Sequence, residues 1–175
     1  MYSLTYTPAY DPYHAVFRHI AILKAANDRC MAARTLRVAD FFVCFPWVIK
    51  ELRAPRSIIG FAKNRNALLK KYQPSAYDSL PDPRVVFERM EPMQITAVSA
   101  MLGARLITRD EGGAENTCLQ EDRISEGMTK AADDFLSEHG ELLRFLTGNL
   151  TQISVFGDDG IFSRSGLGEY KYDVV

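Results

Sequence analysis

Tyr6-Thr-Pro-Ala-Tyr-Asp-Pro-Tyr-His-Ala-Val-Phe-Arg18 is an aromatic leader that runs into a capped helix. Asp11 is a favourable N-cap residue, because its carboxylate accepts hydrogen bonds from the free N–H groups of a first turn. Pro12 fits the first helical position, where no N–H donor is needed. Residues with the i, i+3, i+4 spacing of one helix face follow: Tyr13, Val16, Phe17, Ile20, Leu23 and Lys24. The stretch therefore predicts a packed helix and not a flexible tail.

The length and composition predict a folded protein of one domain, residues 1–175. The chain has 175 residues, of which 47% are hydrophobic, so it can bury a core. Its formal net charge of −1 argues against a polycation that coats nucleic acid. No apolar run approaches about 18 residues, and the start lacks the basic-then-apolar pattern of a signal peptide. We therefore expect a cytoplasmic protein without a membrane span.

The three cysteines support the same compartment. Cys30, Cys44 and Cys118 are odd in number, widely spaced, and form no C-x-x-C pair. This pattern predicts no disulfide framework and a reducing cytosol.

The middle of the chain reads as helices punctuated by proline. A second helix is expected from about Met31 until Pro46, which removes a donor and ends or kinks it. The proline-rich loop 73–84 ends at Asp82-Pro83, which repeats the cap signal and predicts a short helix. Pro92 is expected to open another helix that ends near Gly103.

The end of the chain changes its periodicity. Leu106-Ile107-Thr108 predicts a short strand, and Ser125 is a candidate cap for a helix whose packing continues beyond Gly140. Ile153 and Val155 alternate, 157–160 is a Gly-Asp-Asp-Gly turn, and the apolar residues of 170–174 alternate again. We therefore expect an α+β, mostly helical fold. Its winged helix-turn-helix-like core spans about 12–109, and a helical and β-hairpin part, or small sheet, spans about 124–175.

Four segments carry a family resemblance. They are Pro8-Ala-Tyr-Asp-Pro-Tyr-His-Ala-Val-Phe-Arg18, Leu36-Arg-Val-Ala-Asp-Phe-Phe-Val-Cys-Phe-Pro46, Leu80-Pro-Asp-Pro-Arg-Val-Val-Phe-Glu-Arg-Met-Glu-Pro-Met-Gln94, and Val155-Phe-Gly-Asp-Asp-Gly160 running to Gly168-Glu-Tyr-Lys-Tyr-Asp173. Through them the chain resembles the middle component of bacterial ABC three-component systems, relatives of the Lamassu-type anti-phage systems.

The resemblance implies a small adaptor subunit without enzymatic activity and with winged-helix character. Such a subunit sits between a large SMC- or Rad50-like ATPase that senses foreign DNA and a toxic effector, often a nuclease. The resemblance supplies no catalytic residues.

The residues themselves give no catalytic or cofactor motif. A P-loop, a G-x-S-x-G elbow and an H-E-x-x-H pair are all missing from the sequence. The three histidines and three cysteines lack the spacing of zinc ligands. Asp158-Asp159 could hold a divalent metal, but the flanking glycines favour a turn. We therefore expect no enzyme activity, no cofactor and no metal.

A basic stretch is the best candidate for contact with DNA. It runs from Lys50 to Lys71 with Glu51 as its one acid. A phosphate backbone could follow these cations, with Phe61 and Tyr72 nearby, although a solvated surface is the simpler explanation. The candidates are Lys50, Arg53, Arg56, Lys63, Arg65, Lys70 and Lys71.

Two other features suggest protein partners. Residues 110–141 carry ten acids against Arg123 and Lys130, which suits either a basic partner surface or plain solvation. Tyrosine and phenylalanine gather near both ends and suit either binding hot spots or strand packing. The interface candidates are Tyr10, Asp11, Tyr13, Phe156, Tyr170 and Tyr172.

The alternative function is a stand-alone winged-helix transcription regulator that binds an operator as a dimer. The candidate recognition helix Met93–Leu102 offers only Gln94, Thr96 and Ser99 for reading bases, with no Arg or Lys. This composition favours the adaptor.

Overall fold

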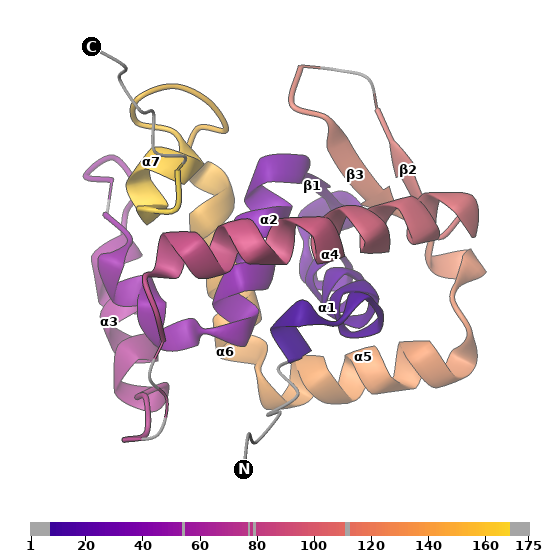
Figure 1. Ribbon diagram of the computed structural model, residues 1–175, viewed down its shortest axis with the longest axis horizontal. Helices are drawn as coiled ribbons and strands as arrows, with labels where there is room; N and C mark the ends of the chain where they lie inside the picture. The colour runs from indigo at the N-terminus through magenta and orange to yellow at the C-terminus, as the bar shows by residue number, and fades with distance from the viewer. Residues whose placement is uncertain (1–7, 54, 77, 79, 111–112, 169–175) are drawn as a thin grey trace.

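The first helix forms where the cap signal predicts it. The computed structural model describes residues 8–53, 55–76, 78, 80–110 and 113–168 (Figure 1). After the 3₁₀ turn η1 (Pro8–Tyr10), helix α1 (Pro12–Ala25) begins at Pro12. Asp11 accepts hydrogen bonds from the backbone N–H groups of Tyr13, at 2.7 Å, and His14, at 3.2 Å. The predicted cap is confirmed.

A short strand precedes the second helix. After the 3₁₀ turn η2 (Asn27–Arg29), strand β1 (Cys30–Ala32) takes up Met31, so helix α2 (Ala33–Cys44) starts two residues later than expected. The prediction that Pro46 ends this helix is confirmed. From Pro46 the chain continues as the 3₁₀ helix η3 (Pro46–Glu51).

The third and fourth helices are joined by the proline-rich loop. Helix α3 (Phe61–Lys71) follows η3, and α4 (Pro83–Gly103) begins after its N-cap Asp82, whose side chain accepts a hydrogen bond from the N–H of Arg84. The expectation that Pro92 opens a new helix is wrong, because Pro92 lies inside one continuous helix. Buried residues continue in phase on both sides of it, and their packing offsets the missing hydrogen bond. They are Val86, Phe87, Met90, Gln94, Ala97 and Met101.

A three-stranded antiparallel sheet joins the N-terminal part to the residues after α4. Strands β2 (Ile107–Arg109) and β3 (Asn116–Leu119) form a hairpin, and β1 pairs with β3, so the sheet order is β1-β3-β2. The predicted strand at Ile107 is confirmed.

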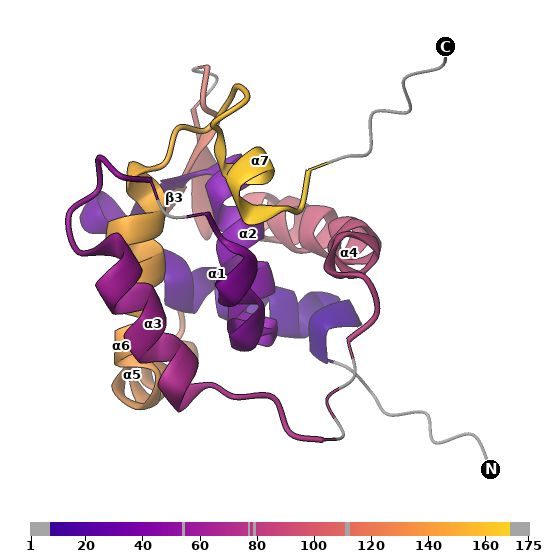
Figure 2. The same ribbon diagram turned by 90° about the vertical axis from the view of Figure 1, so that its left-hand side faces the viewer.

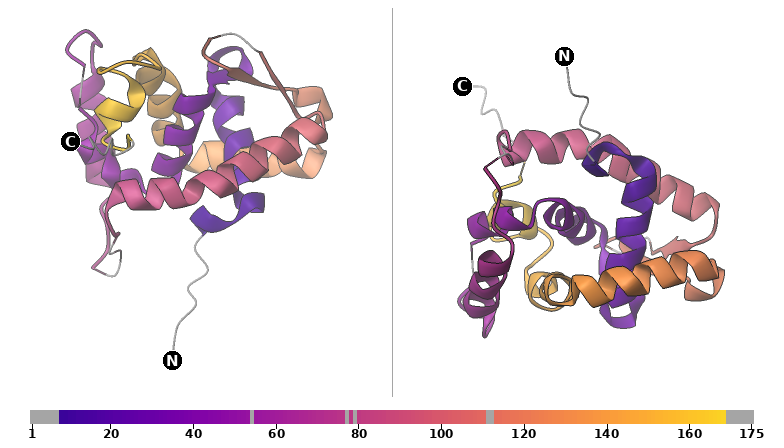
Figure 3. Two further views of the ribbon diagram at one scale, coloured as in Figure 1. Left: turned by 45° about the horizontal axis from the view of Figure 1, so that its top comes forward. Right: turned by 90° about the horizontal axis from the view of Figure 1, so that it is seen from below.

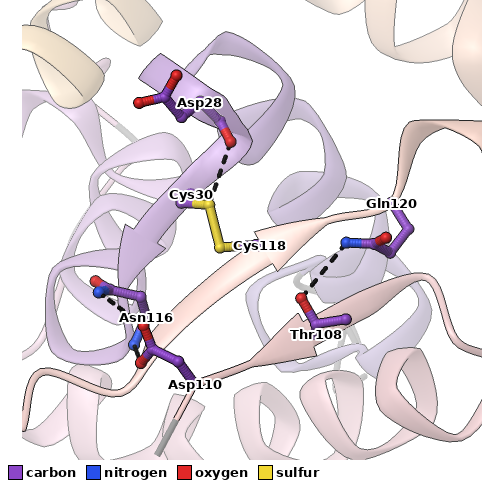
Figure 4. Close-up of a disulfide and its surroundings, with 7 residues drawn as sticks. All are labelled: Asp28, Cys30, Thr108, Asp110, Asn116, Cys118 and Gln120. Carbon is purple, nitrogen blue, oxygen red and sulfur yellow. Dashed lines mark hydrogen bonds between the residues drawn. A yellow bond between two sulfur atoms is a disulfide. The ribbon is translucent and has the colours of Figure 1, made fainter. Parts of the chain in front are cut away.

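The sheet brings two cysteines together. Cys30 lies directly opposite Cys118, and a disulfide joins them across β1 and β3 (Figure 4). Their separation of 88 residues hides this pairing in the sequence. The expectation of no disulfide is therefore wrong, and the cysteines no longer support a reducing compartment.

The C-terminal part is helical as far as the structure describes it. After the 3₁₀ turn η4 (Glu121–Arg123), α5 (Glu126–Glu138) is capped by Ser125. It is followed by α6 (Gly140–Arg144), the π-helical turn η5 (Phe145–Asn149), the 3₁₀ turn η6 (Leu150–Gln152) and α7 (Ile161–Ser165).

The predicted C-terminal hairpin is wrong in its described half. Residues 157–160 form the expected turn, closed by a 2.9 Å bond from the N–H of Gly160 to the carbonyl of Gly157. However, Ile153 and Val155 form no strand and lead into α7. Two alternating residues are too few to predict a strand, since the pattern needs at least four. Residues 170–174, the other half, lie outside the described part of the chain.

Helices surround α1 and α2 at the centre. Viewed from below, α1 lies between α4 on one side and α5 on the other, with α2 beside it (Figure 3). Helix α3 stands next to α6 at the end of the molecule away from the β2–β3 hairpin, and α7 lies between α3 and the near end of α4 (Figures 1 and 2). The fold is α+β and mostly helical, as expected. Its largest fully buried side chains include Phe41, Phe42, Phe61, Ile20, Ile49 and Met90.

Candidate functional site

The basic stretch occupies one end of the molecule, around η3, the following loop and α3 (Figure 2). Two of its seven cations form hydrogen bonds that link neighbouring segments of the chain. Arg53 donates to the carbonyl and hydroxyl oxygens of Ser163 in α7, and Arg65 donates to the carbonyl of Leu52 at 2.7 Å. Because these side chains fix neighbouring segments, they are structural residues in the first place.

The remaining cations are exposed. Lys71 lies 3.6 Å from Glu141, and Lys50 lies 3.9 Å from Glu51, as loose surface pairs. Lys63 and Lys70 are seven residues apart and share the outer face of α3. Within the described ranges neither pairs with an acid, nor does Arg56 in the preceding loop. The exposed basic surface is thus Arg56, Lys63 and Lys70.

The predicted interface residues near the N-terminus are accessible. Tyr13, in the first turn of α1, is 86% exposed, and Tyr10, just before α1, is 39% exposed. A tyrosine this exposed adds little to folding and is a natural anchor for a partner. Asp11 is committed to capping α1 and thus acts first as a structural residue.

The C-terminal candidates divide into described and undescribed residues. Phe156 is 51% exposed in the loop before α7. Tyr170 and Tyr172 lie outside the described residues.

Phe156 begins a stack of alternating aromatic rings and guanidinium groups. Arg34 lies 4.6 Å from the ring centre of Phe156 and 4.9 Å from that of Phe162. Arg37 lies 5.6 Å from Phe162 and 4.8 Å from Phe87. We call these five residues the Arg–Phe ladder. It joins α2, α4, α7 and the loop before α7 by cation–π contacts.

Two open hollows are lined in part by residues of α7. One, of about 650 Å³, is lined by Trp47 and by charged groups of both signs, including Arg53 and Asp82. The other, of about 610 Å³, lies against Arg34 and Phe162. An exposed guanidinium between two rings, beside a hollow, resembles the aromatic and arginine anchors that dominate protein interfaces.

A buried polar cluster ties α1, α2 and α4 together beneath these surfaces. Asp40 is fully buried and accepts hydrogen bonds from Arg18, at 2.6 and 3.2 Å, and from the Gln94 amide, at 2.9 Å. Burial acts to lower the pKa of Arg18, but the charge and hydrogen bond of Asp40 outweigh burial and raise it above its ordinary value. Arg18 is therefore charged.

The same buried surroundings shift the pKa values of two other groups, His19 and Cys44. Burial lowers the pKa of His19, against the opposing charge of Asp40. Burial, with a smaller contribution from Asp40, raises the pKa of the Cys44 thiol to about 12. At neutral pH the imidazole is thus uncharged and Cys44 is an unreactive thiol.

In the candidate recognition helix, the side-chain amide of Gln94 is buried in the protein. Gln94 is 1% exposed and bonded to Asp40 and Arg37, and the Thr96 hydroxyl donates to the carbonyl of Pro92 at 2.7 Å. Of the three residues considered for base reading, Thr96 and Ser99 are exposed and Gln94 is not accessible.

Acidic, cysteine and histidine side chains form no evident metal centre. Among the described residues, no three of His, Cys, Asp or Glu gather closely enough to hold an ion. Asp159 instead accepts a 3.1 Å hydrogen bond from Arg164. No helix in the described part of the chain combines the length and apolarity needed to cross a membrane.

Comparison with known proteins identifies a family. The family model described as ABC-three component (ABC-3C) system Middle Component 5 matches residues 4–173, nearly the whole chain. No curated protein and no solved structure matches the chain.

Proposed function

The chain belongs to the family of middle component 5 of ABC-three component systems, and from this membership we propose that it is a non-enzymatic adaptor. The adaptor links an SMC- or Rad50-like ATPase to an effector, a nuclease, in a cytoplasmic anti-phage or anti-plasmid defence complex of the Lamassu-like kind. The observation that carries the proposal is the family match over residues 4–173, because a middle component of a multi-component system has protein partners by definition.

The exposed anchors support protein binding at two places. Tyr13 projects from the start of α1, and Phe156 covers Arg34 at the outer end of the Arg–Phe ladder. Large aromatic residues at such exposed positions are typical of interfaces. We propose that each anchor contacts a different partner, because they lie on different elements of the fold.

Co-purification tests this assignment. The chain is co-expressed with the two proteins encoded beside its gene, and one of them carries an affinity tag. We expect all three to elute together, and the ATPase and effector to separate when this chain is omitted. Tyr13→Ala and Phe156→Ala should each release one partner, whereas Lys130→Ala, an exposed change on α5, should release neither. Retention of the ATPase and effector without this chain contradicts the adaptor function.

A winged-helix core is part of the proposal. The order α1, β1, α2, α4, β2, β3, with β1 beside β3, is the order of helices and strands in a winged helix, here with η3 and α3 inserted before α4. This order also favours the second candidate function, a stand-alone transcription regulator. The buried Gln94 argues against it, since the corresponding helix must present base-reading side chains. A dimer with a preferred DNA site over competitor DNA would favour the regulator.

Contact with DNA is proposed for the exposed basic surface. Arg56, Lys63 and Lys70 are suitable for phosphates, whereas reversal of Arg53 or Arg65 would disturb folding. We expect Arg56→Glu, Lys63→Glu and Lys70→Glu together to reduce DNA retention by the complex and to weaken its salt dependence. The control reverses exposed Arg89, Arg123 and Lys130 to give the same net charge. Equal loss in both variants contradicts a specific basic surface.

A further inference from the structure

A small cavity lies between α1, α2, α4 and the sheet. Its volume is about 130 Å³. His19 of α1 and Thr117 of β3 contribute polar groups, and Leu36 and Val98 contribute apolar walls. Leu102, which is 36% exposed, also lines the cavity and so marks the side open to solvent.

Two buried polar side chains of this cavity, His19 and Thr117, have no partners among the described residues. His19 is 1% exposed and Thr117 is fully buried. Neither ring nitrogen of His19 nor the Thr117 hydroxyl has a hydrogen-bond partner among the described residues. Oδ2 of Asp40 lies 3.9 Å from Nε2, beyond hydrogen-bond distance. Buried polar groups are nearly always paired, so these atoms indicate a site that an occupant can bind.

The surroundings indicate an uncharged polar group on that occupant. The carboxylate of Asp40 already binds Arg18 and Gln94, and the Arg37 side chain binds Gln94 and Glu91. A charged head beside the neutral imidazole would lose its hydration without gaining a counter-charge. A neutral imidazole offers one donor and one acceptor on different edges of its ring, and a hydroxyl group, which both donates and accepts, can pair with whichever nitrogen faces the cavity. Arg109, the remaining cation lining the cavity, is exposed and so can reach water instead.

The volume and walls indicate the rest of the occupant. An apolar cavity of about 150 Å³ can take up benzene, so this cavity suits a ring of that size. We propose that it binds a small neutral alcohol of the size of phenol, with the hydroxyl between His19 and Thr117 and the apolar body against Leu36 and Val98. This inference does not depend on the adaptor function.

Phenol, benzene and benzoate are the probes, because they share a ring and differ in the head group. Each is titrated into the full chain while NMR records the imidazole signals of His19 and the methyl signals of Val98. We expect phenol to give saturable shifts of both, and benzene and benzoate to bind at least about tenfold more weakly. Shifts that do not saturate, which would indicate a cavity holding water alone, overturn the proposal. So does benzoate binding as tight as that of phenol.

Thr117→Val separates ligand binding from a structural role. Valine keeps the shape of threonine and suits a strand, so the variant should fold. Because the hydroxyl has no partner among the described residues, we expect the melting temperature of the variant to equal or exceed that of the wild type, while its affinity for phenol falls at least about fivefold. The matched control, Thr129→Val on α5, should leave phenol binding unchanged. Unchanged phenol binding in Thr117→Val, or a lowered melting temperature, overturns the proposal.

Discussion

Replacing Asp40 by asparagine should destabilise the protein more than any other single charge removal described above. The substitution turns one carboxylate oxygen into an amide NH₂, which then faces the donors of Arg18 or Gln94. Arg18 is 5% exposed and keeps its charge in the variant, because a guanidinium group is not deprotonated in proteins. Removal of one partner from a buried ion pair costs about 3–5 kcal/mol, a large share of the roughly 5–15 kcal/mol that stabilises a typical domain.

Urea unfolding, monitored by circular dichroism and by the fluorescence of Trp47, measures this loss. Asp133→Asn is the matched control, because Asp133 pairs with Lys24 at the surface, where such pairs contribute about 0–1 kcal/mol. The double variant Arg18→Leu, Asp40→Leu should regain part of the loss, because it leaves no buried charge unpaired. A decrease below about 1 kcal/mol for Asp40→Asn, or no difference from the control, would refute the reasoning.

Three further changes test separate features. Cys30→Ser with Cys118→Ser should lower the free energy of unfolding by up to about 4–5 kcal/mol, since the disulfide closes a loop spanning 88 positions; equal stability with and without a reductant would contradict the bond. Stability should fall as the pH drops below about 6.5, by at most about 1.4 kcal/mol per pH unit, because the lowered pKa of His19 makes the unfolded chain bind the proton first. His19→Gln should flatten this dependence in urea titrations at pH 5.5 and 7.5. Pro92→Ala should raise the stability by about 1–3 kcal/mol, because it restores a helical N–H donor; a lowered melting temperature would contradict this.

The sequence predicted the features that depend on neighbouring residues. Asp11 with Pro12, Asp82 with Pro83, and Ser125 each start a helix where expected, because a cap and the N–H group that donates to it lie within three residues. The end of α2 just before Pro46 was also predicted correctly, because it depends on the geometry of that one residue.

Features that depend on distant packing were missed. Nothing local indicates that α4 continues through Pro92, because the buried face on both sides decides it. Cys30 and Cys118 meet only once β1 pairs with β3, which the sequence did not indicate.

The candidate surfaces were likewise predicted where they depend on neighbouring residues and missed where they depend on distant ones. The sequence located the basic stretch, but composition cannot separate exposed Lys63 and Lys70 from Arg65, which is bound to a carbonyl. The Arg–Phe ladder was missed because its residues come from four separate segments. One signal was available, since Arg34 and Arg37 are three apart and lie on one helix face, but their partners could not be identified.

Helix α4 fixes a distance within the proposed adaptor. Its 21 residues, at 1.5 Å each, make a rod about 30 Å long. Phe87 near one end belongs to the ladder, and the other end leads to the β2–β3 hairpin. Partners docked at the two ends would therefore be held at a set spacing, and one could influence the other by tilting this rod. Pro92, near its middle, is where the backbone hydrogen bonding is interrupted and where the rod would bend most easily.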